Sequence, residues 1–319
     1  MTSHTAPSSA LRRDRAAASA ARRVRRRTGW YAAGFLLPFG SLFLAMMVAP
    51  IGYAVYQSLF KVHRGGLLGG DQRTVFAGFA NFTAAFKDDA FLSSLSRVAV
   101  LGVFQVPFML GLALVIALLL DSRSARFKNA FRLTFFLPYA LPGAIAAIMW
   151  TFLLVKDLSP FTGSLAAIGV HTDFVDHTWF PVSVGNMITW GWTGYNMLII
   201  YSALQAIPAE VTEAAVLDGC SGWRMARLVK IPMVRPALVL TAVFSIIGTS
   251  QLFTEPAVMY AARISGGPSS DFTPIMNTTK IASQGDQNLA SAEAIILALI
   301  TLVLSFGFLK FTQRRMANP

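Results

Sequence analysis

Long stretches without a charged residue constrain this chain more than any other feature. An α-helix needs about 20 predominantly apolar residues to cross the hydrocarbon core of a bilayer. Six stretches reach or approach that length, at residues 29–60, 98–120, 133–155, 184–206, 236–254 and 294–309. The last stretch is the shortest, and it reaches spanning length only by including Glu293. The sequence therefore predicts an all-α, polytopic membrane protein with six transmembrane helices.

The composition supports a membrane setting and argues against nucleic-acid binding. Only 13% of the 319 residues are charged, against about 25% in a typical soluble domain. The net charge of +12 would suit nucleic acid, but the cations lie in the loops between apolar stretches and in an N-terminal tail that can meet anionic headgroups. We therefore expect membrane lipids, and no nucleic acid, as partners of these cations.

Lysine and arginine are concentrated in alternate loops, which orients the predicted helices. Eight arginines precede Trp30, four cations lie between the second and third helices, four between the fourth and fifth, and three after the sixth, so that 19 of the 27 fall on one side. Cytoplasmic loops carry such an excess. Both termini are therefore predicted to be cytoplasmic. Residues 1–28, rich in Arg, Ala and Ser, are predicted to be a basic disordered tail ahead of a transmembrane domain at 29–319.

The predicted cytoplasmic loop at about residues 207–236 contains a distinctive motif. An E-A-A triplet is followed by D-G, nine further residues and an aliphatic-x-aliphatic-Pro sequence. The motif residues are Glu213, Ala214, Ala215, Asp218, Gly219 and Pro232. Residues 209–217 favour a short helix that Gly219 would end in a left-handed conformation, and Pro232 suits the first turn of the next helix. The result would be a small rigid knob between two spanning helices.

This motif resembles the coupling loop of permease subunits in binding-protein-dependent ABC importers. The likeness extends from residue 34 to the C-terminus, through FLLPFGSLFLAMMVAPIGYAVYQSLF, the G-x-x-N-F segment of FAGFANF, and the hairpin around DSRSARFKNAFRLTFFLPYALPG. The chain is most similar to the sugar branch, which includes maltose-type and glycerol 3-phosphate-type permeases. The resemblance implies the type I ABC importer permease fold and a location in the bacterial plasma membrane.

The resemblance also implies a set of partners. Permeases of this family pair with a second homologous permease, two ATP-binding subunits and an extracellular solute-binding protein. The chain contains no G-x-x-x-x-G-K-[ST] sequence, so ATP hydrolysis is expected in separate chains and no enzymatic activity in this one. The six motif residues would contact the ATPase, with Glu213 and Gly219 at the centre.

Polar and aromatic residues within the fourth and fifth predicted helices are candidates for the solute path. Polar groups at bilayer depth are costly and usually face a cavity or another helix. The candidates are Thr189, Trp192, Tyr195, Ser245, Thr249 and Gln251. Aromatic faces combined with hydroxyl and amide groups suit sugars, and the resemblance implies sugar contacts for Tyr195 and Ser245. Packing between helices is the alternative role for each candidate.

The expected solute is a di- or oligosaccharide-like carbohydrate. Import of glycerol 3-phosphate or a glycerophosphodiester by the same machinery is the alternative, with Arg97 and Arg263 as candidate phosphate contacts. A stand-alone secondary transporter is less favoured, because no half-to-half repeat is visible and Glu255 and Glu293 fall at helix ends. Four scattered histidines and one cysteine, Cys220, predict no metal site, no cofactor and no disulfide.

Overall fold

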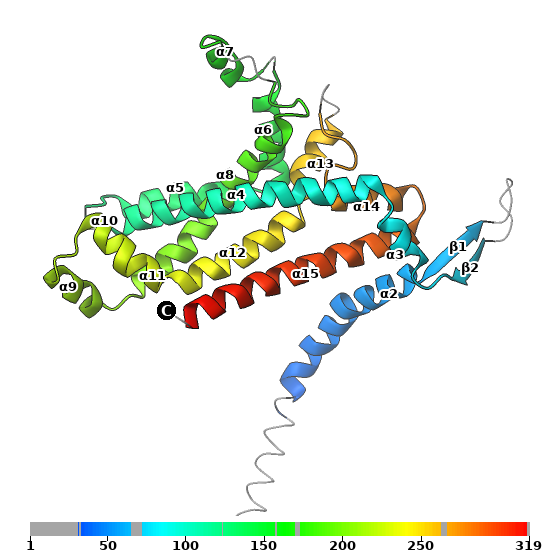
Figure 1. Ribbon diagram of the computed structural model, residues 1–319, viewed down its shortest axis with the longest axis horizontal. Helices are drawn as coiled ribbons and strands as arrows, with labels where there is room; N and C mark the ends of the chain where they lie inside the picture. Colours follow the sequence, from blue (N-terminus) through cyan, green and yellow to red (C-terminus); the bar gives the residue numbers. More distant parts are fainter. Residues whose placement is uncertain are drawn as a thin grey trace, which may run out of the picture. The chain divides into compact units, whose positions relative to one another are not determined.

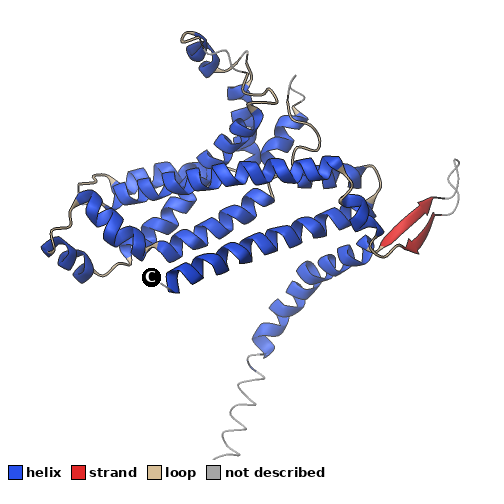
Figure 2. Cartoon of the chain, viewed as in Figure 1, coloured by secondary structure: helices blue, strands red, loops and turns tan. Residues whose placement is uncertain are grey.

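The computed structural model describes residues 31, 33–64, 72–122, 124–156, 158–169, 173–262 and 267–317. Almost all of the elements are helices (Figures 1 and 2). The predicted basic tail at 1–28 lies outside the described residues. The chain divides into two compact units, Met1–Tyr56 and Gln57–Pro319, and each is considered by itself.

The described residues of the first unit form an apolar helix. The helical segment Ala33–Ser58 contains a π-helical turn, η1 (Leu44–Val48), and continues as α2 (Ala49–Ser58). Pro50 lies two residues after the π turn. A proline ring removes a backbone donor and crowds the preceding turn, and a π turn is a common way for a helix to accommodate such a break in its ladder. The helix therefore continues through Pro50 without ending.

The second unit contains a short hairpin and a set of helices. Their bounds are β1 (Phe60–Arg64), β2 (Gln72–Phe76), α3 (Ala80–Ala85), α4 (Asp89–Asp121), α5 (Lys128–Ala140), α6 (Gly143–Leu154), α7 (Pro160–Ala166), α8 (Phe180–Gln205), α9 (Ala209–Leu217), α10 (Gly222–Met225), the π turn η2 (Ala226–Lys230), α11 (Ile231–Met233), α12 (Arg235–Ser250), α13 (Thr254–Ala261), α14 (Pro274–Ser283) and α15 (Gln287–Ala317). Of these, α8 packs along α4 and α5, α12 lies against α4, and α15 lies against α12 (Figure 1).

Helices long and apolar enough to cross a membrane occur at four of the predicted positions. Within the described residues they are Ala33–Ser58, Asp89–Asp121, Arg235–Ala261 and Gln287–Arg314. The bent pair α5 and α6 would make a fifth crossing. Helix α8 has 26 residues and covers the fourth predicted span. Its polar residues lower its mean hydropathy, so it is not among the strongly apolar helices. The structure thus supports a mostly helical membrane domain, in which four to five of the six predicted spans are strongly apolar helices.

The third predicted span, residues 133–155, is divided between two helices, so the prediction of a single helix there was wrong. Helix α5 ends at Ala140, α6 begins at Gly143, and the two are bent by 93°. Leu141 has an extended conformation, with φ −77° and ψ 137°, because the ring of Pro142 disfavours a helical conformation in the residue before it. Pro142 also lacks the N–H that would continue the helical ladder.

A β-hairpin that the all-α prediction did not include follows α2. Strands β1 and β2 are antiparallel, and Phe60 pairs with Phe76 at the base of the hairpin. The buried Asn81 amide donates to the carbonyls of Ser58 (2.8 Å) and Phe60 (2.7 Å). Gly78 has a φ of +53°, which favours glycine. The G-x-x-N-F segment is therefore a structural device: its glycine makes the turn and its asparagine fixes the hairpin base.

Small residues determine how closely α8 approaches its neighbours. Ala113 and Ala117 of α4 are fully buried in a cluster with Met197 and Ile200 of α8. On the α5 side, a Cβ atom on Gly194 would lie 1.8 Å from the carbonyl oxygen of Phe135. Such close backbone approach is typical of helix packing in membranes. It fixes α8 between α4 and α5.

Candidate functional site

The knob predicted around the E-A-A motif is present. Helix α9 has the predicted bounds, and Gly219 after it has a φ of +78°. The Cys220 N–H donates to the Ala215 carbonyl (2.8 Å), and the Gly219 N–H donates to the Val216 carbonyl (3.0 Å). This pair of bonds is the Schellman motif, which ends a helix through a left-handed residue. Both the short helix and its glycine stop are therefore confirmed.

The chain returns to the membrane domain through a helical segment with a second π turn. The Ile231 N–H donates to the Ala226 carbonyl, five residues earlier. Pro232 comes directly afterwards, as the second residue of α11. Because Lys230 before α11 is also helical, α11 continues the segment from the π turn and does not begin a separate helix. The π turn was not predicted.

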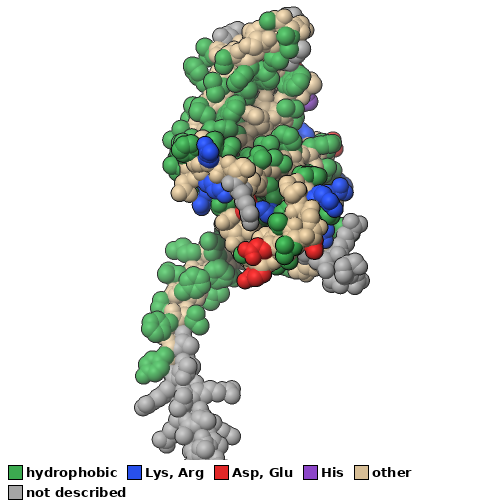
Figure 3. Space-filling view, turned by 90° about the vertical axis from the view of Figure 1, so that its left-hand side faces the viewer, with side chains coloured by type: hydrophobic (Ala, Val, Ile, Leu, Met, Phe, Trp, Pro, Cys, Tyr) green, Lys and Arg blue, Asp and Glu red, His purple; other side chains and the backbone are tan. Residues whose placement is uncertain are grey.

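The knob presents charged and large apolar side chains together. Glu213, Ala214, Asp218 and Gly219 are exposed, whereas Ala215 is buried. Leu217 is 89% exposed and Trp223 is 68% exposed. Figure 3 shows this end of the membrane domain, with acidic and basic side chains gathered on it. Exposed apolar groups beside charges are typical of a surface that binds another protein.

An ion pair fastens this segment to the spanning helices. The ammonium of Lys230, in η2, pairs with a carboxylate oxygen of Asp121, the last residue of α4. The other Asp121 oxygen accepts a bond of 2.5 Å from the amide of Gln205, the last residue of α8. The sequence analysis did not predict this cluster, because its members lie in three segments that are far apart in the chain.

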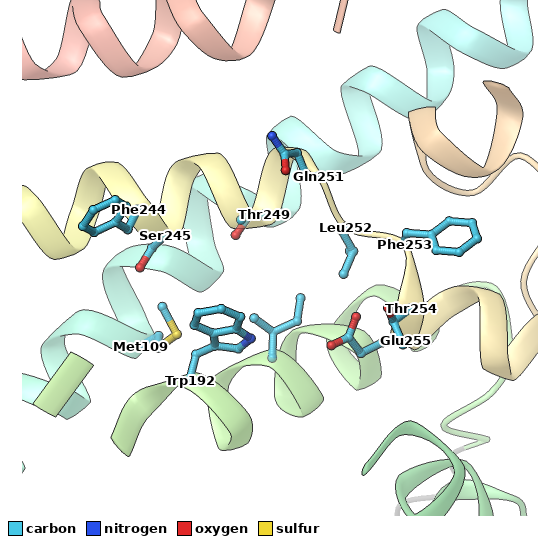
Figure 4. Close-up of a pocket in the computed structure, with 12 residues that line it drawn as sticks. Met109, Trp192, Phe244, Ser245, Thr249, Gln251, Leu252, Phe253, Thr254 and Glu255 are labelled. Carbon is cyan, nitrogen blue, oxygen red and sulfur yellow. The ribbon is translucent and has the colours of Figure 1, made fainter. Parts of the chain in front are cut away.

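A cavity of about 180 Å³ lies between α8 and α12 (Figure 4). Its lining residues are Met109, Ile188, Trp192, Phe244, Ser245, Gly248, Thr249, Gln251, Leu252, Phe253, Thr254 and Glu255. Four of the six predicted path residues are among them: Trp192, Ser245, Thr249 and Gln251. These four come from the two helices that flank the knob segment.

The other two predicted path residues do not line this cavity. Thr189 is buried and accepts a hydrogen bond from the Gln105 amide (3.4 Å), while the Thr249 hydroxyl donates to the Gln105 carbonyl oxygen (3.4 Å). Gln105 therefore links α4 to α8 and α12. The Tyr195 ring stacks on Tyr139 at 4.6 Å. Tyr195 is thus next to the cavity through an aromatic cluster, since its ring also lies 5.9 Å from that of Trp192.

Among the described residues that line the cavity, one side chain is ionisable, and the sequence analysis did not select it as a path residue. Glu255 lies in the first turn of α13, after the break in helix at residues 251–253. Beyond the break, the Glu255 carboxylate is directed toward the side on which Trp192 lies, whereas the Phe253 ring points away from it (Figure 4). An apolar stretch followed by an acid gives no sign of such a break, so Glu255 was read as a residue at a helix end.

Arg97, considered as a phosphate contact, has another role. Its guanidinium donates to the backbone carbonyls of Asp271 (3.2 Å) and Phe272 (3.4 Å) and lies 5.7 Å from the Phe272 ring centre. Arg97 therefore fastens the segment before α14 to α4. Arg263 lies outside the described residues. No Lys or Arg occurs among the described residues that line the cavity.

Comparison with known proteins agrees with the motif and the fold. Residues 109–318 match the protein family described as "Binding-protein-dependent transport system inner membrane component". The chain is 30% identical to the lactose transport system permease protein LacF of Rhizobium radiobacter, over 90% of this chain and 94% of that protein. It is 28% identical to the sn-glycerol-3-phosphate transport system permease protein UgpA of Agrobacterium fabrum, over 83% of this chain and 89% of that protein. It is 27% identical to the diacetylchitobiose uptake system permease protein NgcF of Streptomyces coelicolor, over 97% of this chain and 90% of that protein.

A solved structure shares the fold. A chain in the crystal structure of a bacterial ABC transporter involved in the import of the acidic polysaccharide alginate superposes with a TM-score of 0.76. The match covers 92% of this chain and 99% of that chain, at 19% identity. With the E-A-A knob and the helical membrane domain, these matches show that the chain belongs to the family of binding-protein-dependent transport system inner membrane components, as a permease subunit of an ABC importer and not an enzyme.

Proposed function

We propose that this permease forms half of the translocation path for a di- or oligosaccharide-like carbohydrate. An extracellular binding protein delivers the solute, and separate ATPase subunits drive transport. The observation that carries the proposal is the cavity, in which the Trp192 ring lies near the hydroxyls of Ser245 and Thr249. An aromatic face packs against the C–H face of a sugar, and hydroxyl groups bind its hydroxyls. The similarity to lactose and diacetylchitobiose permeases supports the same solute class.

Glycerol 3-phosphate is the second candidate, supported by the similarity to UgpA proteins. A phosphate ester in this cavity would meet the Glu255 carboxylate and, among the described lining residues, no cation. Like charges a few ångströms apart repel strongly where water is limited. The chemistry of the cavity therefore favours the carbohydrate.

We propose further that the knob is the contact for the ATPase. The acids and glycine of the motif, Glu213, Asp218 and Gly219, are exposed, whereas Ala215 is buried and supports the helix cap. A partner that grips α9 would move the knob as a rigid body. The Asp121–Lys230 pair would carry that motion to α4 and α8. A second homologous permease and two ATP-binding subunits complete the assembly.

For the topology we propose six crossings, with both termini and residues 207–236 in the cytoplasm. The broken pair α5–α6 serves as the third crossing and α8 as the fourth. At 1.5 Å per residue, the 26 residues of α8 extend about 39 Å, which is long enough to cross a bilayer. The distribution of Lys and Arg in the sequence supports this orientation.

Uptake by the whole importer tests the solute class. The permease, its partner permease, the ATPase subunits and the binding protein are reconstituted in proteoliposomes. ATP-dependent uptake is then measured with radiolabelled lactose, N,N′-diacetylchitobiose and glycerol 3-phosphate. We expect accumulation of a saccharide. Accumulation of glycerol 3-phosphate alone would overturn the proposal in favour of the second candidate.

A further inference from the structure

We infer that Glu255 selects the charge of the transported solute. Its carboxylate accepts hydrogen bonds from a neutral or amino-bearing saccharide, and it excludes anionic solutes such as uronic acids and sugar phosphates. The inference rests on the proposed function, because it concerns the same cavity. It adds a residue that the sequence analysis did not select and a property, the charge of the solute, that the motif does not determine.

The Glu255 carboxylate is placed where a solute in the cavity can reach it. Glu255 lines the cavity together with Trp192, and Figure 4 shows its carboxylate directed toward the side on which Trp192 lies. The group accepts a hydrogen bond from its own backbone N–H. It forms no ion pair within the described residues. A carboxylate offers about four acceptor sites, so most of its capacity remains available to a solute.

The other polar groups that line the cavity carry no charge. Ser245, Thr249 and Gln251 are neutral, and the Thr249 hydroxyl already donates to Gln105. Neutral groups of this kind bind a hydroxyl, a carbonyl or a carboxylate of the solute with little discrimination by charge. Among the described lining residues, only Glu255 can therefore distinguish a neutral solute from an anion.

Glu255 shares the cavity with an aromatic ring. Two neighbouring hydroxyls of a sugar can donate to the two oxygens of one carboxylate while the C–H face of the sugar packs on the Trp192 ring. A carboxylate or phosphate on the solute would replace these donors with a like charge. In a cavity that is partly closed to water, this repulsion is much stronger than in bulk solvent. Hydroxyls or an ammonium group fit the site, and anions do not.

Substitution of Glu255 tests the inference in the complete reconstituted importer. The variants are Glu255→Gln, which keeps the shape and loses the charge, and Glu255→Asp, which keeps the charge. Asp89→Asn, at an exposed acid in the first turn of α4, is the matched control for loss of an acid elsewhere. Lactose, N,N′-diacetylchitobiose, chitobiose and glycerol 3-phosphate serve as probes. Each probe is first titrated against the binding protein, so that uptake is compared at saturation of the same binding protein.

We expect Glu255→Gln to lower the saturated rate of saccharide uptake by roughly 10- to 100-fold, as for loss of a hydrogen bond to a charged acceptor. Glu255→Asp should retain most of the rate, and Asp89→Asn should be unaffected. ATPase stimulation by the loaded binding protein should persist in Glu255→Gln, which a misfolded variant would lose. Chitobiose, which carries free amines, should be slowed by Glu255→Gln more than its acetylated counterpart.

Two results would overturn the inference while the proposed function stands. One is a wild-type rate of saccharide uptake in Glu255→Gln, and the other is an equal loss in Glu255→Gln and Glu255→Asp. Failure of the proposed function has a separate signature in the wild-type importer, namely no uptake of any saccharide together with uptake of glycerol 3-phosphate. The wild-type measurements therefore separate the two failures before any variant is compared.

Discussion

Lys230 of the knob segment forms an ion pair with Asp121 at the end of α4, although 109 positions separate them in the chain. The side chains are only 18% and 10% exposed. Asp121 also binds Gln205 of α8, so one carboxylate joins the knob segment to the ends of two spanning helices. This arrangement suits the transfer of motion between the knob and the membrane domain.

Removal of one partner of this pair should therefore weaken coupling. Lys230→Met leaves the Asp121 carboxylate without its cation in a largely buried site, which costs about 1–3 kcal/mol. We expect a lower ratio of solute transported to ATP hydrolysed in proteoliposomes. The exchange Asp121→Lys with Lys230→Asp should recover part of that ratio. If Lys230→Met couples as well as the wild type, the pair has no part in transmission.

The glycine stop of the knob offers a second test. Gly219 has a φ of +78°, a conformation that costs an L-residue about 1–2 kcal/mol. Gly219→Asp should therefore disturb the end of α9 and abolish coupled transport while the protein still inserts. Glu213→Lys should have the same effect through its reversed charge. The measurement is ATPase stimulation beside uptake in the same vesicles, and full stimulation in both variants would mean that the knob is only a connector.

The cavity residues should affect the solute and not the assembly. Ser245→Ala and Trp192→Ala each remove a group that lines the cavity. Each should weaken the interaction with the solute by about 1–3 kcal/mol, which slows uptake at limiting solute. Tyr195→Ala should also weaken transport, because the stack on Tyr139 supports Trp192. Tyr195→Phe keeps the stack and should be close to the wild type. Normal uptake in both Ser245→Ala and Trp192→Ala would place the solute elsewhere.

A pair of glycines in α8 provides a matched test of helix packing. A Cβ on Gly194 would meet the Phe135 carbonyl oxygen at 1.8 Å, whereas a Cβ on Gly191 would meet nothing within 4 Å. Gly194→Ala should therefore force α5 away from α8 and lower the free energy of unfolding by about 1–3 kcal/mol. Gly191→Ala should be neutral or slightly stabilising, since alanine favours the helix. Thermal unfolding of the purified importer compares the two, and equal melting temperatures would contradict this packing.

The orientation is testable by cysteine labelling in intact cells. The background is Cys220→Ser, because the native cysteine lies within the knob segment. A membrane-impermeant maleimide should label Asp173→Cys and Asp286→Cys but not Arg224→Cys. Labelling at position 224 from outside would reverse the proposed topology.

The sequence by itself determined the membrane class, the knob and the family. Charge-free stretches and the E-A-A motif are local properties, and α9 with its Gly219 stop depends on contacts within a few residues. The bend at Leu141–Pro142 was also open to local reasoning, but an apolar stretch that contains both Pro138 and Pro142 does not show which of the two breaks the helix. Tertiary structure alone decided the Asp121–Lys230 pair, the close approach at Gly194 and the turn that directs Glu255 into the cavity. Each depends on which helices become neighbours, and apolar helices of similar composition do not encode that arrangement in any local pattern.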